Sequence, residues 1–123
     1  MADDPAGRIL VVEDDHDARR ALAELLQHQG YDVIEAENGR VALERLRSAN
    51  DVRLILLDLY MPEMDGRAFR AEQMKHADMA GIPVIIITGA FEMVRGTDPR
   101  GVVAVLSKPV EFDHLLPIID QHC

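Results

Sequence analysis

The sequence predicts an α/β domain in which a parallel sheet is covered by helices on both faces. Short runs of Val, Ile and Leu alternate along the chain with segments of helical periodicity, five of each. Strands that are apolar along their whole length are typical of parallel sheets, because both of their faces are buried. Alternation with helices favours the same architecture, since parallel neighbours need a crossover connection. With 123 residues, the chain has the length of one domain.

The first half of the chain is predicted to hold two strand–helix pairs. The strand Ile9–Val12 ends in three acidic residues, Glu13–Asp15, and a helix follows that Gly30 ends. A second strand is expected over Tyr31–Glu37, and a short amphipathic helix over Val41–Leu46. Acidic residues favour the start of a helix, which accounts for the last of the three acids but not for three in a row.

The stretch Leu54–Gly66, LILLDLYMPEMDG, organises the middle of the chain. A buried strand ends there in one carboxylate, Asp58, at the edge where open α/β sheets bind ligands. A turn follows, with Asp65 as the expected cap of the next helix and Gly66 as a residue that tolerates backbone angles that others avoid. On this segment alone, a buried strand whose Asp merely caps a loop explains the pattern equally well.

The second half of the chain is predicted to continue the alternation, with one irregular segment. Glycine costs about 1 kcal/mol and proline about 3 kcal/mol inside a helix. Gly96, Pro99 and Gly101 interrupt the fourth helix, so we expect it to be short, broken or displaced. The other expected elements are a helix over Asp65–His76, a connector over Met79–Pro83, strands over Val84–Ile87 and Val102–Leu106, and a helix over Glu111–Gln121 that Pro117 kinks or delays.

Composition excludes several classes of function. The net charge of −9 argues against direct binding of nucleic acid, which needs a basic surface. The single cysteine, Cys123, permits no internal disulfide and fits a reducing compartment. No apolar run approaches the roughly 20 residues of a membrane helix, and no signal peptide precedes Arg8. We expect a soluble cytoplasmic protein.

Polar side chains follow four of the predicted strands. Glu13 and Asp14 follow the first strand, Asp58 the third, Thr88 the fourth and Lys108 the fifth. Each has an ordinary explanation alone, as a helix cap, a strand end or a surface charge. Together at one sheet edge they offer oxygen ligands for Mg²⁺, a carboxylate nucleophile, and two donors for the oxygens of a transferred phosphoryl group.

These residues lie in motifs that resemble the receiver domain of bacterial two-component response regulators. The resemblance covers essentially Arg8–Gln121, and we assign residues 8–122 to this domain, after a flexible arm of residues 1–7. The matching motifs are Ile9-Leu10-Val11-Val12-Glu13-Asp14-Asp15, Leu56-Leu57-Asp58-Leu59-Tyr60-Met61-Pro62-Glu63-Met64-Asp65-Gly66, Ile86-Ile87-Thr88-Gly89-Ala90 and Ser107-Lys108-Pro109.

The resemblance implies a flavodoxin-like fold and a phosphorylation site. The five-stranded parallel sheet would have the order 2-1-3-4-5, which the fold class shares with other doubly wound proteins. Asp58 would accept a phosphoryl group from the phosphohistidine of a histidine kinase or a His-phosphotransfer protein. Glu13, Asp14, Asp58 and the backbone carbonyl of Tyr60 would hold Mg²⁺.

The resemblance also implies a switch and not a metabolic enzyme. Lys108 would pair with the phosphoryl oxygens and form a cis peptide bond with Pro109. Thr88 would turn toward the phosphoryl group, whose added charge biases two states of the domain. The downstream target would be a protein, with the domain itself a monomer or a weak homodimer.

The sequence departs from the family pattern at four places. Val105 replaces the usual aromatic residue three positions before the lysine, and the segment Thr88–Lys108 is about two residues shorter than usual. Tyr60 is bulky, and Ala90 offers no polar group to a hydrolytic water. We therefore predict a long-lived phosphoryl group and weakened coupling of Thr88 to the usual output surface.

Two alternative functions remain open at this point. A degenerate receiver would act only as a docking or dimerisation module, which Val105 and the broken fourth helix favour. An aspartate-nucleophile phosphohydrolase would need a second Asp two residues after Asp58, where this chain has Tyr60. The cognate kinase, the output, and whether the domain stands alone or belongs to a longer protein are not determined by the sequence.

Overall fold

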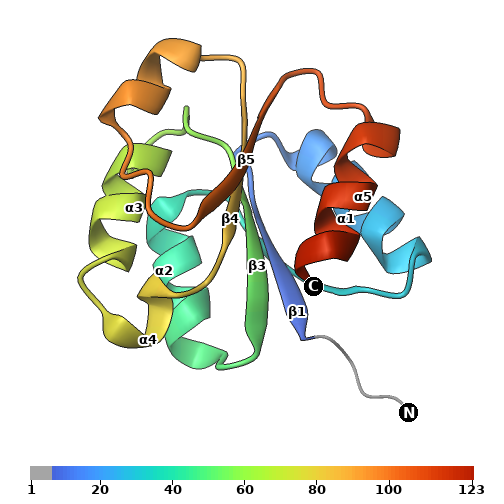
Figure 1. Ribbon diagram of the computed structural model, residues 1–123, viewed down its shortest axis with the longest axis horizontal. Coiled ribbons are helices and arrows are strands. Elements are labelled where there is room, and N and C mark those ends of the chain that lie inside the picture. Colours follow the sequence, from blue (N-terminus) through green and yellow to red (C-terminus); the bar gives the residue numbers. More distant parts are fainter. Residues whose placement is uncertain (1–6) are drawn as a thin grey trace.

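The central sheet is parallel throughout and has the strand order β2-β1-β3-β4-β5 in the computed structural model, which describes residues 7–123 (Figure 1). Residues 1–6 of the expected arm lie outside the described residues. The strands are β1 (Arg8–Val12), β2 (Asp32–Ala36), β3 (Val52–Leu57), β4 (Val84–Thr88) and β5 (Val102–Ser107). The helices are α1 (His16–His28), α2 (Gly39–Ser48), α3 (Gly66–Gln73), α4 (Ala77–Ala80), the 3-10 helix η1 (Phe91–Gly96) and α5 (Phe112–His122).

Alternating residues of the continuous apolar strands build two cores, one on each face of the sheet. Helices α1 and α5 cover one face, and α2, α3 and α4 lie on the other (Figure 1). Burial on both faces is the reason that these strands carry no polar alternation. The α1–α5 face buries Ile9, Val11, Leu54, Leu56, Ile85 and Ile87. The opposite face buries Leu10, Val12, Ile55, Leu57, Val84 and Ile86.

Short polar side chains start the helices that follow the carboxyl edge of the sheet. Asp15 Oδ1 accepts hydrogen bonds from the backbone N–H groups of Asp17 and Ala18 at the start of α1. Asn38 caps α2 in the same way, and Asp65 caps α3, as predicted. These caps satisfy helix N–H groups that have no partner within the helix.

The predicted helix over Asp65–His76 and the connector after it are wrong in detail. The helix α3 ends at Gln73, and a separate short helix, α4, occupies part of the expected connector. The side chain of Gln73 is buried and its Nε2 donates to the carbonyl of Met79, 2.9 Å away. This bond accompanies the turn of the chain between the two helices.

The segment between β4 and β5 holds only the 3-10 helix η1, which agrees with the predicted short and irregular fourth helix. Because η1 is so short, the sheet edge at β5 remains uncovered. Val103 and Val105 are each 37% exposed, and Phe91 is 51% exposed. The last helix, α5, begins at Phe112 and continues through Pro117, which is exposed. Among the described residues, no helix has the length and apolarity needed to cross a membrane.

Candidate functional site

The two acidic strand ends are held beside one another by backbone hydrogen bonds that continue the sheet. The N–H of Asp58 donates to the carbonyl of Val12 at 3.0 Å and joins the ends of β3 and β1. The N–H of Glu13 donates to the carbonyl of Ala36 at 3.0 Å and fixes the end of β1 against β2. Parallel pairing therefore brings the ends of β1 and β3 together at one edge. The residues Glu13 and Asp58 are 8% and 5% exposed, so their charges need a partner.

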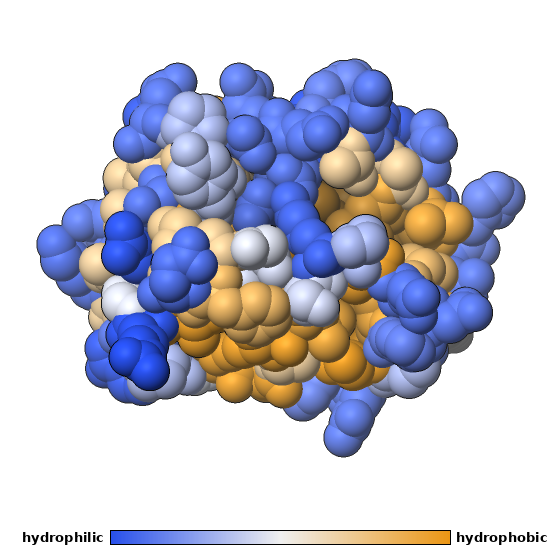
Figure 2. Space-filling view, turned by 90° about the horizontal axis from the view of Figure 1, so that it is seen from above, coloured by the Kyte–Doolittle hydropathy of each residue, from blue (hydrophilic) through white to orange (hydrophobic). Residues whose placement is uncertain are grey.

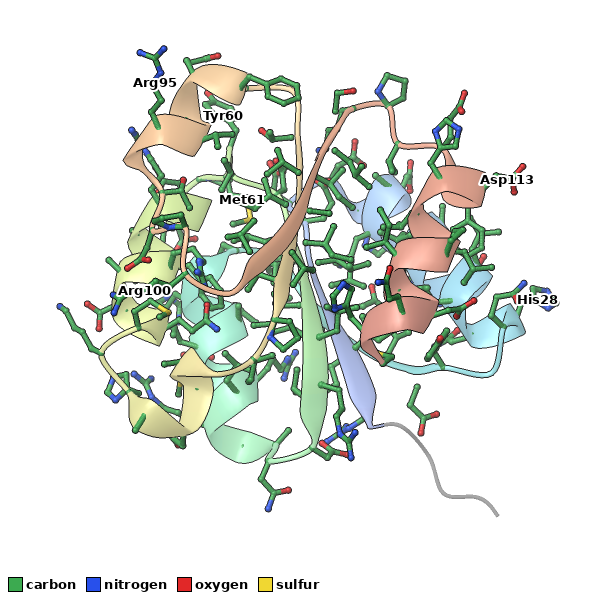
Figure 3. All side chains as sticks on the ribbon, in the orientation of Figure 1. His28, Tyr60, Met61, Arg95, Arg100 and Asp113 are labelled. Atoms are coloured by element: carbon green, nitrogen blue, oxygen red, sulfur yellow. The ribbon has the colours of Figure 1, made fainter. Side chains whose placement is uncertain are left out.

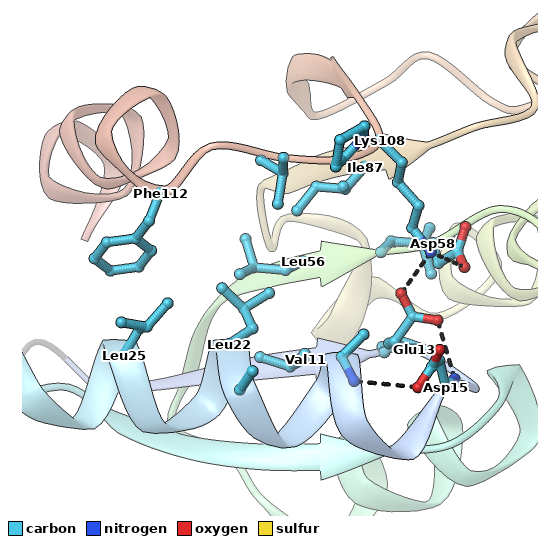
Figure 4. A pocket seen from close by; sticks show the side chains of 16 residues that line it. Val11, Glu13, Asp15, Leu22, Leu25, Leu56, Asp58, Ile87, Lys108 and Phe112 are labelled. Carbon is cyan, nitrogen blue, oxygen red and sulfur yellow. Dashed lines mark hydrogen bonds and ion pairs between the residues drawn. The ribbon is translucent and has the colours of Figure 1, made fainter.

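Lys108 supplies that partner. Its backbone N–H donates to the carbonyl of Thr88 at 3.1 Å, which fixes the turn after β5. Its Nζ donates to Glu13 Oε1 at 2.6 Å and to Asp58 Oδ2 at 2.9 Å (Figure 4). Burial lowers the pKa of the Lys108 ammonium, but the two carboxylates outweigh burial and raise this pKa above its ordinary value. The peptide bond from Lys108 to Pro109 is cis, as the resemblance implied.

A third carboxylate completes an oxygen cluster of the kind that divalent cations bind. Glu13, Asp14 and Asp58 each offer an oxygen, and these oxygens lie within 4.8 Å of one another. Burial and the neighbouring Glu13 raise the pKa of Asp14, as expected where carboxylates crowd. A set of carboxylate oxygens fits Mg²⁺, a hard cation, and would relieve this crowding.

Tyr60 and Thr88 lie near this cluster but outside its ion pairs. The backbone N–H of Tyr60 donates to Asp58 Oδ1 at 3.2 Å. Its side chain is 72% exposed and lies at the upper end of the molecule, the end of the carboxyl edge (Figure 3). Thr88 is fully buried at the end of β4, and its Oγ1 accepts a hydrogen bond from the N–H of Ala90 at 2.9 Å.

Sequence reasoning missed how the loop after Asp58 is built. The residue with a left-handed backbone is Glu63, with φ 63°, and not Gly66. Gly66 is needed for space, because a Cβ there would lie 2.7 Å from the Cα of Leu59 and 2.9 Å from the carbonyl oxygen of Asp58. The small residue lets α3 start directly against the loop that carries Asp58.

Arg19 is a second residue that sequence reasoning missed. Its Nη1 donates to the backbone carbonyl of Glu13 at 2.9 Å, and its Nε pairs with Glu35 on β2 at 3.1 Å. Arg19 therefore holds the acidic turn after β1 against the neighbouring strand. In the sequence, Arg19 is marked only by its position one helical turn after the cap Asp15. Many surface arginines occupy such a position, so the sequence could not single it out.

The fold and this site together define a receiver domain. The sequence profile of the response regulator receiver domain matches residues 9–120, and the chain belongs to that family. Members of the family are signalling switches of two-component systems, generally bind Mg²⁺, and interact with histidine kinases and phosphotransfer proteins.

Curated relatives and solved structures agree with this assignment. The chain is 38% identical to the response regulator receiver protein CpdR of Brucella abortus, over 93% of this chain and 94% of that protein. It is also 38% identical to the transcriptional regulatory protein GlrR of Escherichia coli, over 98% of this chain, but it spans only 27% of that protein.

Two solved receiver structures superpose closely on the chain. A response regulator receiver protein from Pseudomonas putida is 27% identical, with a TM-score of 0.88 over 98% of this chain and 99% of that one. The response regulator TrrA of Thermotoga maritima, in complex with Mg²⁺ and BeF, is 29% identical, with a TM-score of 0.82 over 95% and 99% of the two chains.

Proposed function

We propose that Asp58 accepts a phosphoryl group, in a reaction that depends on Mg²⁺, from the phosphohistidine of a histidine kinase or a His-phosphotransfer protein. The observation that carries the proposal is the bridge from Lys108 to Glu13 and Asp58. It brings one ammonium and two carboxylates from three different strand ends to one point. The domain proposed to do this comprises residues 8–122.

The chemistry requires a carboxylate nucleophile with donors for the phosphoryl oxygens. An oxygen of Asp58 attacks phosphorus, a P–O bond forms, the P–N bond to the donor histidine breaks, and the released imidazole takes up a proton. Lys108 lies 2.9 Å from Asp58 and would turn its Nζ toward the transferred oxygens. The buried hydroxyl of Thr88 would exchange its contact with Ala90 for one with the phosphoryl group.

The metal would be held by Glu13, Asp14, Asp58 and the carbonyl of Tyr60. When bound, Mg²⁺ neutralises charge on the phosphoryl oxygens and so favours attack by an anion. The complex of TrrA with Mg²⁺ and BeF supports this assignment, because that relative shares the fold over nearly the whole chain. We further propose that the phosphoryl group is long-lived, since Ala90 offers no polar side chain to an attacking water.

Labelling with acetyl phosphate tests the proposal. The protein is incubated with Mg²⁺ and acetyl phosphate, and its intact mass is measured. We expect one added phosphoryl group on the wild type, none on Asp58→Asn, and one on the matched control Asp17→Asn, which removes an exposed carboxylate of α1. Chelation of Mg²⁺ should prevent labelling.

The other outcomes of this experiment point to other functions. An unlabelled wild type would indicate a docking module, for which the exposed Phe91, Val103 and Val105 would be the candidate surface. Repeated turnover of a generic phosphate ester would indicate a phosphohydrolase. Rapid loss of the label in the presence of Mg²⁺ would contradict the predicted long lifetime.

A further inference from the structure

A cavity of about 530 Å³ opens between α1 and α5, on the face of the sheet away from α2 and α3. This volume lies within the range of pockets that bind small molecules, which is roughly 300–1,000 Å³. Figure 2 shows apolar surface continuing into a hollow on the side where α1 and α5 lie in Figure 1. No role in phosphoryl transfer described above requires such a volume.

The floor and walls of the cavity are apolar. Its floor is formed by side chains of the sheet, among them Val11 and Leu56, which are each 1% exposed. One wall is a stripe of α1 that runs from Ala18 to Leu25, and its alanines leave room that longer side chains would fill. The helix rises about 10 Å over the seven steps from Ala18 to Leu25. Phe112 of α5 faces Leu25 at the open end (Figure 4).

The opposite end of the cavity is polar and carries excess negative charge. Three carboxylates line it, those of Glu13, Asp15 and Asp58, against the single ammonium of Lys108. Lys108 already pairs with Glu13 and Asp58. Asp15 uses Oδ1 to cap α1, while among residues 7–123 no protein donor contacts its Oδ2. In the metal-free protein, the polar end therefore carries two negative charges in excess, and Asp15, which is not one of the proposed Mg²⁺ ligands, keeps an acceptor oxygen for a ligand.

We propose that this cavity binds a small amphipathic cation, an apolar chain that carries one amine head group. The chain would lie along the α1 stripe, with its far end between Leu25 and Phe112. The ammonium would pair with the carboxylate of Asp15 and would be attracted by the excess negative charge at the polar end. An anionic ligand of the same shape is disfavoured, because the single ammonium there is already neutralised by two carboxylates. Given the proposed function, occupancy would also shield Asp58 from phosphodonors.

Titration of the whole chain with octylammonium tests the site, below the concentration at which this probe forms micelles. Backbone amide shifts are followed by NMR, with 1-octanol and octanoate as probes of equal chain length. We expect octylammonium to shift the amides of α1 and of residues 110–112. Its affinity should be about tenfold above that of octanoate because of the cavity charge. Octanol should lie between the two.

Paired variants separate the two ends of the site. Ala21 is exposed and lines the cavity, so Ala21→Phe should fill the cavity and abolish binding. The control Ala71→Phe makes the same change at an exposed position of α3 and should leave binding unchanged. Asp15→Asn keeps a good helix cap but removes one charge. It should weaken octylammonium several-fold without affecting octanol, while the control Asp17→Asn should leave both nearly unchanged.

Three results of the titration of the wild type would each overturn the proposal. They are absence of octylammonium binding, shifts that lie outside the α1–α5 cavity, and octanoate that binds as tightly as octylammonium. Unchanged binding to Ala21→Phe would do the same. The titration contains no Mg²⁺ and no phosphodonor, so its outcome is independent of whether Asp58 accepts a phosphoryl group.

Discussion

At the scale of single residues, Lys108 offsets the repulsion between the carboxylates at the acidic edge of the sheet. Its ammonium neutralises two nearly buried carboxylates, Glu13 and Asp58, at 2.6 and 2.9 Å. Removing one partner of a buried ion pair leaves an unpaired charge, which commonly costs about 3–5 kcal/mol. The side chain of Lys108 is 35% exposed, so water reduces this cost here.

Lys108→Met should therefore lower the free energy of unfolding by about 1–2 kcal/mol at neutral pH without Mg²⁺. The loss should shrink as the pH rises past the raised pKa of Lys108, because the wild type then also loses the ammonium charge. Denaturant unfolding at several pH values measures both effects. The control Lys75→Met breaks an exposed pair with Glu72 and should change stability by under about 0.5 kcal/mol. Equal effects of the two variants would show that Lys108 has no special electrostatic role.

Tyr31 is the residue with the clearest dependence on pH. Burial, and then the hydrogen bond that its hydroxyl donates to Asp120, raise the pKa of Tyr31. The unfolded chain loses this proton near pH 10, the ordinary value, whereas the folded protein keeps it to higher pH. The stabilising contribution of Tyr31 is thus complete below about pH 10 and is lost as the pH rises further.

Spectrophotometric titration of Tyr60→Phe checks this prediction, because Tyr31 is then the only tyrosine of the chain. We expect its tyrosinate absorbance to develop above the pH at which a free tyrosine titrates. In Tyr31→Phe, the extra loss of stability at alkaline pH should disappear. An absorbance that develops at the ordinary pKa would contradict the hydrogen bond from Tyr31 to Asp120.

At the scale of elements, a buried arginine connects α3 to the segment that replaces a regular fourth helix. Arg70 is fully buried, and its guanidinium donates to the carbonyls of Asp98 and Arg100 and to Gln73 Oε1. Burial lowers the pKa of Arg70, and the charge of Asp98 opposes this effect. The contacts fasten the chain between η1 and β5 to α3, across 28 to 30 positions of sequence.

Arg70→Met should destabilise the protein by about 2–3 kcal/mol, since it leaves the buried Gln73 Oε1 and two part-buried carbonyls without this donor. Hydrogen exchange should accelerate most at residues 97–102. The matched control Arg67→Met lies on the exposed side of the same helix and should cost under about 0.5 kcal/mol. If exchange accelerated evenly over the whole protein, Arg70 would not be a local anchor.

At the scale of the whole molecule, we expect the Arg70 contacts to limit how far a change at the proposed phosphorylation site spreads. Movement of the Thr88 hydroxyl would break its bond with Ala90, directly before η1. The far end of the same segment is held by Arg70 through Asp98. A displacement that starts at Thr88 should therefore decline before it reaches β5, where Val105 is exposed in place of the usual aromatic residue.

Amide NMR shifts with Mg²⁺ and beryllofluoride measure this spread, given the proposed function. We expect large changes from Thr88 to Met93 and small ones from Asp98 to Val105. In Arg70→Met, the changes should extend into the second range, while Arg67→Met should behave as wild type. Large changes at Val105 in the wild type would show that coupling reaches β5 by another route.

The fold was predictable because its signals are local and repeat along the chain. Apolar runs, helical periodicity and caps such as Asp65 depend on near neighbours, and the topology of parallel strands follows from short crossovers. The convergence of Glu13, Asp58 and Lys108 follows as well, because all three sit at carboxyl ends of strands. The expected helix end at His76 was wrong, because α3 ends at Gln73, whose side chain makes a non-local hydrogen bond with the carbonyl of Met79.

By itself, the sequence determined the sheet, its acidic edge and the identity of the residues gathered there. Only the tertiary structure decided what those residues contact. Lys108 bridges partners 95 and 50 positions away, and Arg70 meets carbonyls that carry no side-chain signal. The cavity between α1 and α5 depends on how two helices pack on one face of the sheet. Such features arise from distances between elements, which no local pattern of residues encodes.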